Sequence, residues 1–561
     1  MEEAAVIAPT VWACVATGVL GATPAGIEDR PAERPSLVVL IVIDQFPAWI
    51  IPRVDRHFGP GGFRRLMDDG AWFEQAYYPQ SATITGVGHA TIATGALPAG
   101  HGIVGNQWFD RATGKEVYCV ADESVQVIGG PAEKEPKVSP RLMTATTFAD
   151  ENRIASGFRA KTVAISAKDR SAILLAGPTG KAIWFTQKSG LFLSSTYYFP
   201  DGKLPKWAAD VNATQPALRY FNKTWNPLLD AAAYGAPRDD RPWEIDHKGL
   251  GRTFPHVLGA GLKPGPDFYK ALTVSPMANE LLLDLARAAI AGEQLGARGA
   301  TDVLCVSLTS NDYVGHAFGP ESIEYLDMTL QTDRQLAKFF TDLDAQIGAG
   351  RWSVVLTSDH GACPSPEFLR EQGMEVGRVD PAQIIAAADK ALDDTFGSED
   401  WLAPYNDPGV TLRVEPLKKH KIAAAHAQRV VAEAIRHVTG VADAFPALQL
   451  ASGQIQQTPV ARAAAATVHL DRGPDVIVIP KPYWYLSREM HTHAAMHGTP
   501  YSYDSHVPLF FYGPGIPSGR HLQRVLVTDL AATISSYLQM PAPTSAEGLD
   551  LLHDRVHAKQ W

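Results

Sequence analysis

Three aspartates in the sequence each follow a short apolar run, and two of them are accompanied by a histidine. Asp44 ends the first run, Asp312 and His316 follow the second, and Asp359 and His360 end the third. The spacing of four between Asp312 and His316 places both side chains on one face of a helical turn. Carboxylate and imidazole ligands without cysteine favour zinc, with manganese or iron as alternatives. The pattern predicts a metal site, although each aspartate alone also suits a helix cap or turn.

One more histidine would complete this ligand set. The candidate is His497, which lies in a loop rich in glycine and proline before an apolar run at residues 507–512. His491, His493 and His506 lie close to it in the sequence and remain alternatives, because spacing alone does not distinguish them.

A hydroxyl side chain is predicted to lie at the start of a helix. The segment 81–95 begins with small and hydroxyl residues, becomes periodically apolar and ends at Gly95, which predicts a helix that starts near Thr85. The helix dipole and a bound metal would both lower the pKa of the Thr85 hydroxyl and make it a nucleophile. The alternative is that Thr83 or Thr85 only caps the helix.

The elements that must position these residues are buried strands. Residues 36–44, 302–309 and 352–357 are continuous runs rich in β-branched residues, as in strands buried on both faces. Residues 277–293 and 321–347 have the pattern of amphipathic helices. This alternation predicts an α/β fold with a doubly wound, mostly parallel central sheet flanked by helices. Ligands of such sheets bind at the carboxyl ends of the strands, where the aspartates lie.

The chain also contains segments that interrupt this alternation of strands and helices. We expect the core to comprise residues 36–409 and 470–561, with an insertion within about 111–276 that lacks a regular strand and helix alternation. Residues 410–469 are predicted to form a small α+β insertion. It is built from a strand at 410–414, a helix at 422–438 and a strand-like segment at 445–450. Core strands are expected again at 475–479 and 507–512, followed by a last helix near 528–538.

Composition and charge narrow the class of protein. The 561 residues carry a formal net charge of −10, and 45% are hydrophobic and 20% charged. These values exclude a disordered chain, a coiled coil and a protein that holds a polyanion by bulk positive charge. The four cysteines have no C-x-x-C spacing, so they form neither a thiolate zinc site nor a dense disulfide scaffold.

The N-terminal residues have the composition of an export signal. Residues 4–27 are uncharged and mostly small or apolar, so residues 1–27 are predicted to be a signal peptide, followed by a linker at 28–35. A membrane anchor or a disordered arm is the alternative. No later segment is apolar for long enough to span a bilayer. We therefore expect a periplasmic or secreted protein.

Taken in order, these motifs resemble those of the alkaline phosphatase superfamily, in particular its type I phosphodiesterase/nucleotide pyrophosphatase branch. The motifs run through nearly the whole chain after the linker: Asp44-Gln45, Thr85 with a following Gly-His-Ala-Thr, Asn106, Asp312 with His316, Ser358-Asp-His-Gly361, and His497-Gly before a Val-Pro-Leu-Phe strand. Within that branch, Lys168-Asp-Arg170 is similar to the Lys-x-Arg pair of phosphate-irrepressible bacterial alkaline phosphatases. The resemblance implies an alkaline phosphatase-like fold.

The resemblance also implies two zinc ions per chain and a covalent intermediate. One zinc ion would be held by Asp312, His316 and His497. The other would be held by Asp44, Asp359, His360 and the Thr85 oxygen. Thr85 would attack phosphorus in line and become phosphothreonine, which is then hydrolysed. Asn106 would donate its amide to a nonbridging phosphoryl oxygen.

Lys168 and Arg170 indicate the substrate class. A phosphomonoester keeps a doubly charged phosphoryl group, and two cations aimed at it favour a monoester over a diester. The resemblance thus implies an alkaline phosphatase with promiscuous phosphodiesterase activity. A phosphodiesterase or nucleotide pyrophosphatase on the same core is the alternative, and a noncatalytic binding protein with the same fold is a third. A sulfatase is disfavoured because no C/S-x-P-x-R motif surrounds Thr85.

The expected partners follow from this activity. They are small phosphate esters, with no nucleic acid as a structural partner. We expect the chain to act as a monomer.

Overall fold

The computed structural model describes residues 34–131, 135–235, 239–487 and 492–553. The predicted signal peptide and residues 28–33 of the predicted linker lie outside the described residues. Within the described ranges, no helix has the length and apolar character needed to cross a membrane.

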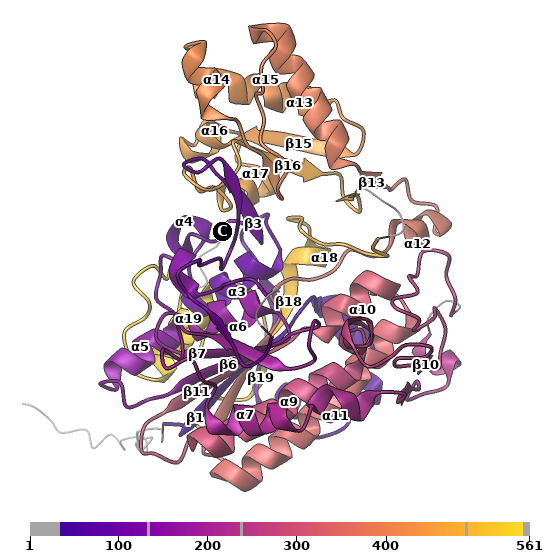
Figure 1. The fold of residues 1–561 in the computed structure, drawn as a ribbon, viewed down its shortest axis with the longest axis vertical. Coiled ribbons are helices and arrows are strands. Elements are labelled where there is room, and N and C mark those ends of the chain that lie inside the picture. The colour runs from indigo at the N-terminus through magenta and orange to yellow at the C-terminus, as the bar shows by residue number, and fades with distance from the viewer. Residues whose placement is uncertain (1–33, 132–134, 236–238, 488–491, 554–561) are drawn as a thin grey trace, which may run out of the picture.

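A ten-stranded sheet forms the centre of the larger part of the molecule (Figure 1). Five neighbouring strands run parallel, and in their order across the sheet they are β12 (Trp352–Thr357), β1 (Leu37–Ile43), β11 (Asp302–Leu308), β6 (Thr162–Ser166) and β7 (Lys181–Phe185). Of the outer strands, β18 (His506–Tyr512) and β8 (Phe192–Ser195) run antiparallel to their neighbours. The predicted α/β fold with a mostly parallel central sheet is confirmed.

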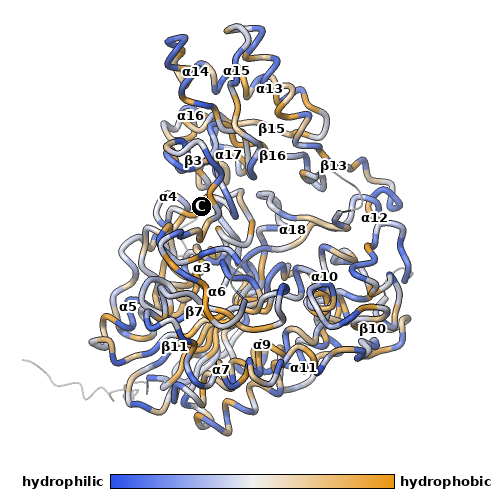
Figure 2. Tube along the Cα trace, in the orientation of Figure 1, coloured by the Kyte–Doolittle hydropathy of each residue, from blue (hydrophilic) through white to orange (hydrophobic). Residues whose placement is uncertain are grey.

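The apolar runs are continuous because both faces of the sheet are buried. In β1, Val38, Leu40 and Val42 pack into the core on one face, whereas Leu37, Val39, Ile41 and Ile43 pack into the core on the other. Alternate side chains of a strand point to opposite faces, so both sets of β1 side chains are apolar because both faces are covered. Figure 2 shows hydrophobic segments gathered inside this sheet, around β7 and β11.

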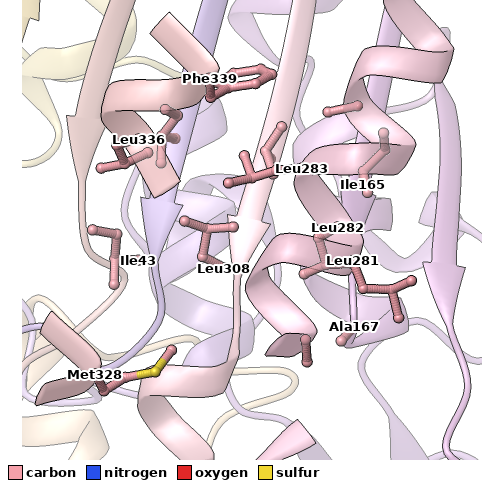
Figure 3. Close-up of a cluster of buried hydrophobic side chains, with 14 of the residues drawn as sticks. Ile43, Ile165, Ala167, Leu281, Leu282, Leu283, Leu308, Met328, Leu336 and Phe339 are labelled. Atoms are coloured by element: carbon pink, nitrogen blue, oxygen red, sulfur yellow. The ribbon is translucent and has the colours of Figure 1, made fainter. Parts of the chain in front are cut away.

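Helices cover the two faces. On one face, α9 (Pro276–Glu293) and α11 (Ile323–Leu343) pack over the strands, and Figure 3 shows their leucines beside Ile43 of β1 and Leu308 of β11. The other face is covered by α3 (Thr85–Thr94), α5 (Phe148–Ala155), α6 (Asp169–Ala176) and α19 (Asp529–Tyr537). The helices predicted at 277–293 and 321–347 are α9 and α11, the latter extended by a π turn at Asp344–Gly348.

A smaller unit lies above the central sheet in Figure 1. Its three-stranded sheet has the order β14 (Gly409–Val410), β16 (Val476–Pro480), β15 (Val441–Pro446). Two helices, α13 (Pro381–Phe396) and α15 (Ala424–Arg436), share a hydrophobic cluster with it. The helix expected at 422–438 is therefore present as α15.

Two expected strands in this region differ from the structure. The run at 475–479 was expected in the core, but as β16 it pairs with β14 and β15 in the small sheet. An apolar run predicts a strand buried on both faces but does not identify its partners. The strand-like segment at 445–450 ends at Pro446, which precedes the short helix α16 (Ala447–Ala451), because proline suits the start of a helix better than a strand interior.

The strand expected at 410–414 is also shorter than predicted. Only Gly409 and Val410 pair as β14, and α14 (Val414–Lys419) begins at the end of the expected strand. The stretch from Arg111 to Pro276 contributes β6, α6, β7 and β8 to the central sheet and its cover.

Candidate active site and metal centre

The candidate site lies at the carboxyl ends of four neighbouring parallel strands. Asp359 follows β12, Asp44 follows β1, Asp312 lies on α10 (Ser310–Phe318) after β11, and Lys168 follows β6. Because these strands are adjacent and parallel, the four polar residues converge at one edge of the sheet. The topology therefore brings together side chains that are as far apart as residues 44 and 359 in the chain.

One group of possible ligands consists of Asp44, Asp359 and His360. A ligand atom from each lies within 4.8 Å of the others. The Nε2 of His360 is 3.6 Å from Asp44 Oδ1 and 3.5 Å from Asp359 Oδ2. All three residues are fully buried. This group matches one of the two ligand sets that the resemblance implied.

A second group adjoins the first. Its ligand atoms, from Asp312, His360 and His497, also lie within 4.8 Å of one another. His360 and His497 stack with ring centroids 3.6 Å apart. His316 Nε2 lies 3.2 Å from Asp312 Oδ1, so this histidine borders the group without being one of its three members. The structure thus brings the predicted aspartate and histidine ligands together but places His360 in both groups.

Of the four candidate histidines, His497 lies at the site. His506 is on β18, where it stacks on Tyr77 and its Nε2 lies 2.6 Å from the Glu74 carbonyl oxygen. His493 packs its ring edge-on against His316 at 4.9 Å. His491 lies outside the described residues.

The three histidines at the centre are each held through the same ring nitrogen. The Nδ1 atoms of His316, His360 and His497 lie 2.8–2.9 Å from backbone carbonyl oxygens of Ala495, Gly361 and Thr83, respectively. A carbonyl only accepts a hydrogen bond, so each Nδ1 carries a proton and each Nε2 is the nitrogen left to face the site. Burial lowers the pKa of His360 and His497. Both imidazoles are therefore neutral at pH 7, as metal ligands must be.

The charges of the centre fit bound cations. Three buried aspartates face a single buried ammonium, that of Lys168, whose Nζ lies 2.7 Å from Asp44 Oδ2 and 2.6 Å from Asp312 Oδ2. Burial and the neighbouring Asp359 carboxylate raise the pKa of Asp44. Among the described residues, nothing hydrogen-bonds to Asp44 Oδ1 or to His360 Nε2. Buried, unpartnered ligand atoms with excess negative charge are what a divalent cation would satisfy.

Thr85 is the first residue of α3 and is buried beside these groups. The helix cap is Ile84, and neither Thr83 nor Thr85 makes a capping hydrogen bond, because the Thr83 hydroxyl donates to the Thr499 carbonyl. Lys168 Nζ lies 3.4 Å from Thr85 Oγ1. The Thr85 hydroxyl is therefore available for chemistry at a helix N-terminus, next to the lysine that contacts an aspartate of each metal group.

The remaining predicted residues surround Thr85. Asn106 Oδ1 accepts a hydrogen bond from the Gly86 backbone N–H at 2.9 Å, which leaves its NH₂ group as the donor. Arg170 lies on the first turn of α6, with its guanidinium beside the Tyr118 hydroxyl. The aspartates Asp312 and Asp44 outweigh the effect of burial and raise the pKa of Lys168, which stays charged.

Two residues of the site were not given a role from the sequence. His89, one turn after Thr85, lies with Nδ1 2.9 Å from the Thr85 carbonyl oxygen and 3.2 Å from Asp359 Oδ2. The sequence signal for His89 was its spacing of four from Thr85, which places both residues on one face of a helix. Gln45 follows Asp44 directly and contacts both metal groups, as described below.

Comparisons with known proteins agree with this geometry. The sequence model of the type I phosphodiesterase/nucleotide pyrophosphatase family matches residues 38–502. The chain belongs to this family. It is similar to the alkaline phosphatase PhoV of Synechococcus elongatus, with 34% identity over 550 residues that cover 95% of this chain and 98% of PhoV.

The chain is also similar to a relative whose crystal structure is known. The alkaline phosphatase PafA of Elizabethkingia meningoseptica is 34% identical over 555 residues, which cover 97% of this chain and 98% of PafA. The crystal structure of wild-type PafA superposes with a TM-score of 0.84, covering 93% of this chain and 99% of that chain. The family resemblance and the fold that it implied are confirmed.

Proposed function

We propose that this chain is a zinc-dependent alkaline phosphatase that hydrolyses phosphomonoesters through a phosphothreonine at Thr85, with promiscuous phosphodiesterase activity. The observation that carries the proposal is the position of Lys168, whose Nζ lies 3.4 Å from Thr85 Oγ1 and between the two metal groups. The full-length similarity to proteins named alkaline phosphatases supports the same activity.

Thr85 performs the nucleophilic step. Its Oγ1 loses a proton to solvent and forms a bond to phosphorus while the bond from phosphorus to the ester oxygen breaks, and the alcohol leaves with a proton from solvent. Water then attacks phosphorus, the bond to Oγ1 breaks and Oγ1 takes up a proton, so that inorganic phosphate and free Thr85 result. Helix α3 orients the Thr85 oxygen. The backbone N–H of its second residue, Gly86, donates a hydrogen bond to Asn106 Oδ1 at 2.9 Å.

The metal ions would be held by residues of the two groups. We propose one zinc ion at Asp44, Asp359, His360 and the Thr85 oxygen, and one at Asp312, His316 and His497. When bound, the ions supply Lewis acidity, which lowers the pKa of a hydroxyl group and stabilises charge on the phosphoryl oxygens. The excess of buried carboxylates and the neutral histidines support this assignment.

Lys168, Arg170 and Asn106 would bind the phosphoryl oxygens. The charges of Lys168 and Arg170 favour the doubly charged group of a monoester, because a diester replaces one of those oxygens by a second substituent. Lys168 is buried and Arg170 is partly buried, so both act where water screens their charges less than at the surface.

The decisive experiment compares two substrates on zinc-loaded protein. We expect a higher kcat/KM for p-nitrophenyl phosphate than for bis-p-nitrophenyl phosphate. A preference for the diester would instead assign the chain to the phosphodiesterases or nucleotide pyrophosphatases of the same family. Hydrolysis of neither ester at any pH from neutral to alkaline would favour a noncatalytic binding protein.

We further propose that the protein acts outside the cytoplasm. The proposal rests on the composition of residues 4–27, which suits an export signal. Fractionation of cells that express the full chain should recover phosphatase activity in the periplasm or the medium.

A further inference from the structure

Gln45 adopts an unusual backbone conformation next to a proposed metal ligand. It follows Asp44 directly, is fully buried and has a φ of 57°. A non-glycine residue in the left-handed region is uncommon and unfavourable unless its surroundings hold it there. Strained residues of this kind cluster at functional sites, so the hydrogen bonds made by Gln45 are of interest.

The left-handed turn lets Gln45 reach both metal groups at once. Its backbone N–H donates to Asp359 Oδ1 at 3.1 Å. Its side-chain Nε2 donates to Asp312 Oδ1 at 2.9 Å and lies 3.5 Å from His316 Nε2. One residue thus contacts a carboxylate of each group.

The surroundings hold the Gln45 side chain and main chain in place. The Tyr325 hydroxyl donates to the Gln45 backbone carbonyl. On the other side, α10 approaches so closely that a Cβ atom on Gly315 would lie 1.8 Å from Gln45 Oε1. Among the described residues, nothing donates to that oxygen. A strained backbone and a buried, unpaired oxygen both disfavour this arrangement, so local stability does not explain it.

We infer that Gln45 is a positioning residue that holds Asp312, His316 and Asp359 in place for metal binding. The inference rests on the proposed function, because it assumes that these residues are metal ligands. Hydrogen bonds from outside the ligand set orient ligands and leave the correct atoms facing the metal. Here the amide holds Asp312 beside His316, and the backbone N–H fixes one oxygen of Asp359.

A simpler account is that Gln45 only forms a turn between β1 and the following segment. Glycine would then serve as well or better, because it adopts a positive φ without strain. The two accounts differ in what they require of the side-chain amide, which a turn does not need. Gln45→Gly separates them, since it keeps the backbone N–H and carbonyl but removes the amide.

The test measures zinc affinity of purified, metal-free protein by competition with a chelator, and thermal unfolding of the same samples. Gln294→Gly is the matched control, because Gln294 is an exposed glutamine with φ 55° at the end of α9. We expect Gln294→Gly to bind two zinc ions with wild-type affinity. Gln45→Gly should bind at least one zinc ion 10–100-fold more weakly, the effect typical of losing such a contact.

The contact with Gly315 provides an independent measurement. Gly315→Ala places a methyl group against the Gln45 amide and should weaken zinc binding by a similar factor. In the Gln45→Gly background the same substitution should have little effect, because the amide it displaces is absent. If the losses of zinc-binding free energy in the two single variants simply add in the double variant, the inference is contradicted.

The outcomes separate this inference from the proposed function. If the wild type binds two zinc ions and Gln45→Gly binds both within threefold as tightly, Gln45 has no positioning role although the proposed function stands. If the wild type binds no zinc, both are wrong. Should Gln45→Gly fail to fold, Gln45→Asn replaces it, since asparagine tolerates positive φ but its amide is one methylene too short to reach Asp312. Wild-type zinc affinity in Gln45→Asn would then overturn the inference.

Discussion

The Lys168 ammonium nitrogen lies 3.4 Å from the Thr85 hydroxyl oxygen. The two residues are 83 positions apart and lie at the N-termini of α6 and α3, which cover the same face of the central sheet. A phosphoryl group attacked by Thr85 would therefore lie against a fixed positive charge. This relationship connects the nucleophile to substrate choice.

Replacing Lys168 and Arg170 together by alanine should remove the preference for monoesters. We expect kcat/KM for p-nitrophenyl phosphate to fall by about 10²-fold or more, because each charged hydrogen bond contributes about 1.5–3 kcal/mol. The rate with the bis ester should fall much less. Lys206→Ala, which removes an exposed lysine on α7 (Lys206–Ala213), is the control for a change of charge. Equal losses for both esters would show that the two cations do not select the substrate.

Of the competing histidines, His497 should be the one that zinc binding requires. We expect His497→Ala to lose zinc and activity, because its Nε2 lies in a group with Asp312 and His360. His506→Ala should keep both, since His506 contacts the Glu74 backbone on β18 instead. Zinc content per chain and phosphatase activity measure the effect. The ligand assignment is wrong if His506→Ala loses zinc and His497→Ala does not.

Removing the metal should inactivate and destabilise the protein. Dialysis against a chelator is expected to abolish activity, and added zinc to restore it. The zinc-free protein should melt at a lower temperature, because a ligand present at 100–1,000 times its Kd stabilises the folded state by about 2.7–4.1 kcal/mol. Full activity at fewer than about one zinc ion per chain would refute the two-metal mechanism.

The position of the proposed site could be predicted from the sequence because strand burial leaves a clear signal. The runs at 36–44, 302–309 and 352–357 consist largely of buried apolar residues, since helices cover both faces of the sheet, and an aspartate lies at or just after the carboxyl end of each. The polar residues that end them must lie at one edge when the strands are parallel. The convergence of Asp44, Asp312 and Asp359 follows from that pattern alone.

Features that depend on tertiary contacts could not be predicted in this way. The run at 475–479 is as apolar as a core strand, yet it pairs in the small sheet. Spacing alone could not distinguish His497 from its neighbours, because a loop folds according to contacts such as that between His497 Nδ1 and the Thr83 carbonyl. The left-handed conformation of Gln45 has no local sequence signal, since glycine or asparagine would be expected there.

Asp504 should make stability depend on pH. Its Oδ2 accepts hydrogen bonds from the Thr499 backbone N–H and hydroxyl, and burial raises the pKa of Asp504 to about 8. The unfolded chain loses this proton near pH 4, so between about pH 4 and 8 the folded state binds more protons. The free energy of unfolding should therefore fall as pH rises through this window, by at most about 1.4 kcal/mol per pH unit.

The variant Asp504→Asn replaces the titrating carboxyl group by an amide that does not titrate. Comparison with the wild type therefore isolates the contribution of this carboxyl group. In metal-free protein, the difference in Tm between Asp504→Asn and the wild type should shift in favour of the variant from pH 5 to pH 8. Other titrating groups contribute equally to both proteins and cancel in the difference. A constant difference across this range would show that Asp504 is ionised in the folded protein throughout.

The most direct test of the account is the activity of Thr85→Ala on p-nitrophenyl phosphate, measured on zinc-loaded protein and corrected for its zinc content. If the Thr85 oxygen attacks phosphorus, kcat/KM should fall by about 10³-fold or more, as expected for loss of a nucleophile. Activity within tenfold of the wild type at full zinc occupancy would show that Thr85 is not the nucleophile and would contradict the proposed mechanism.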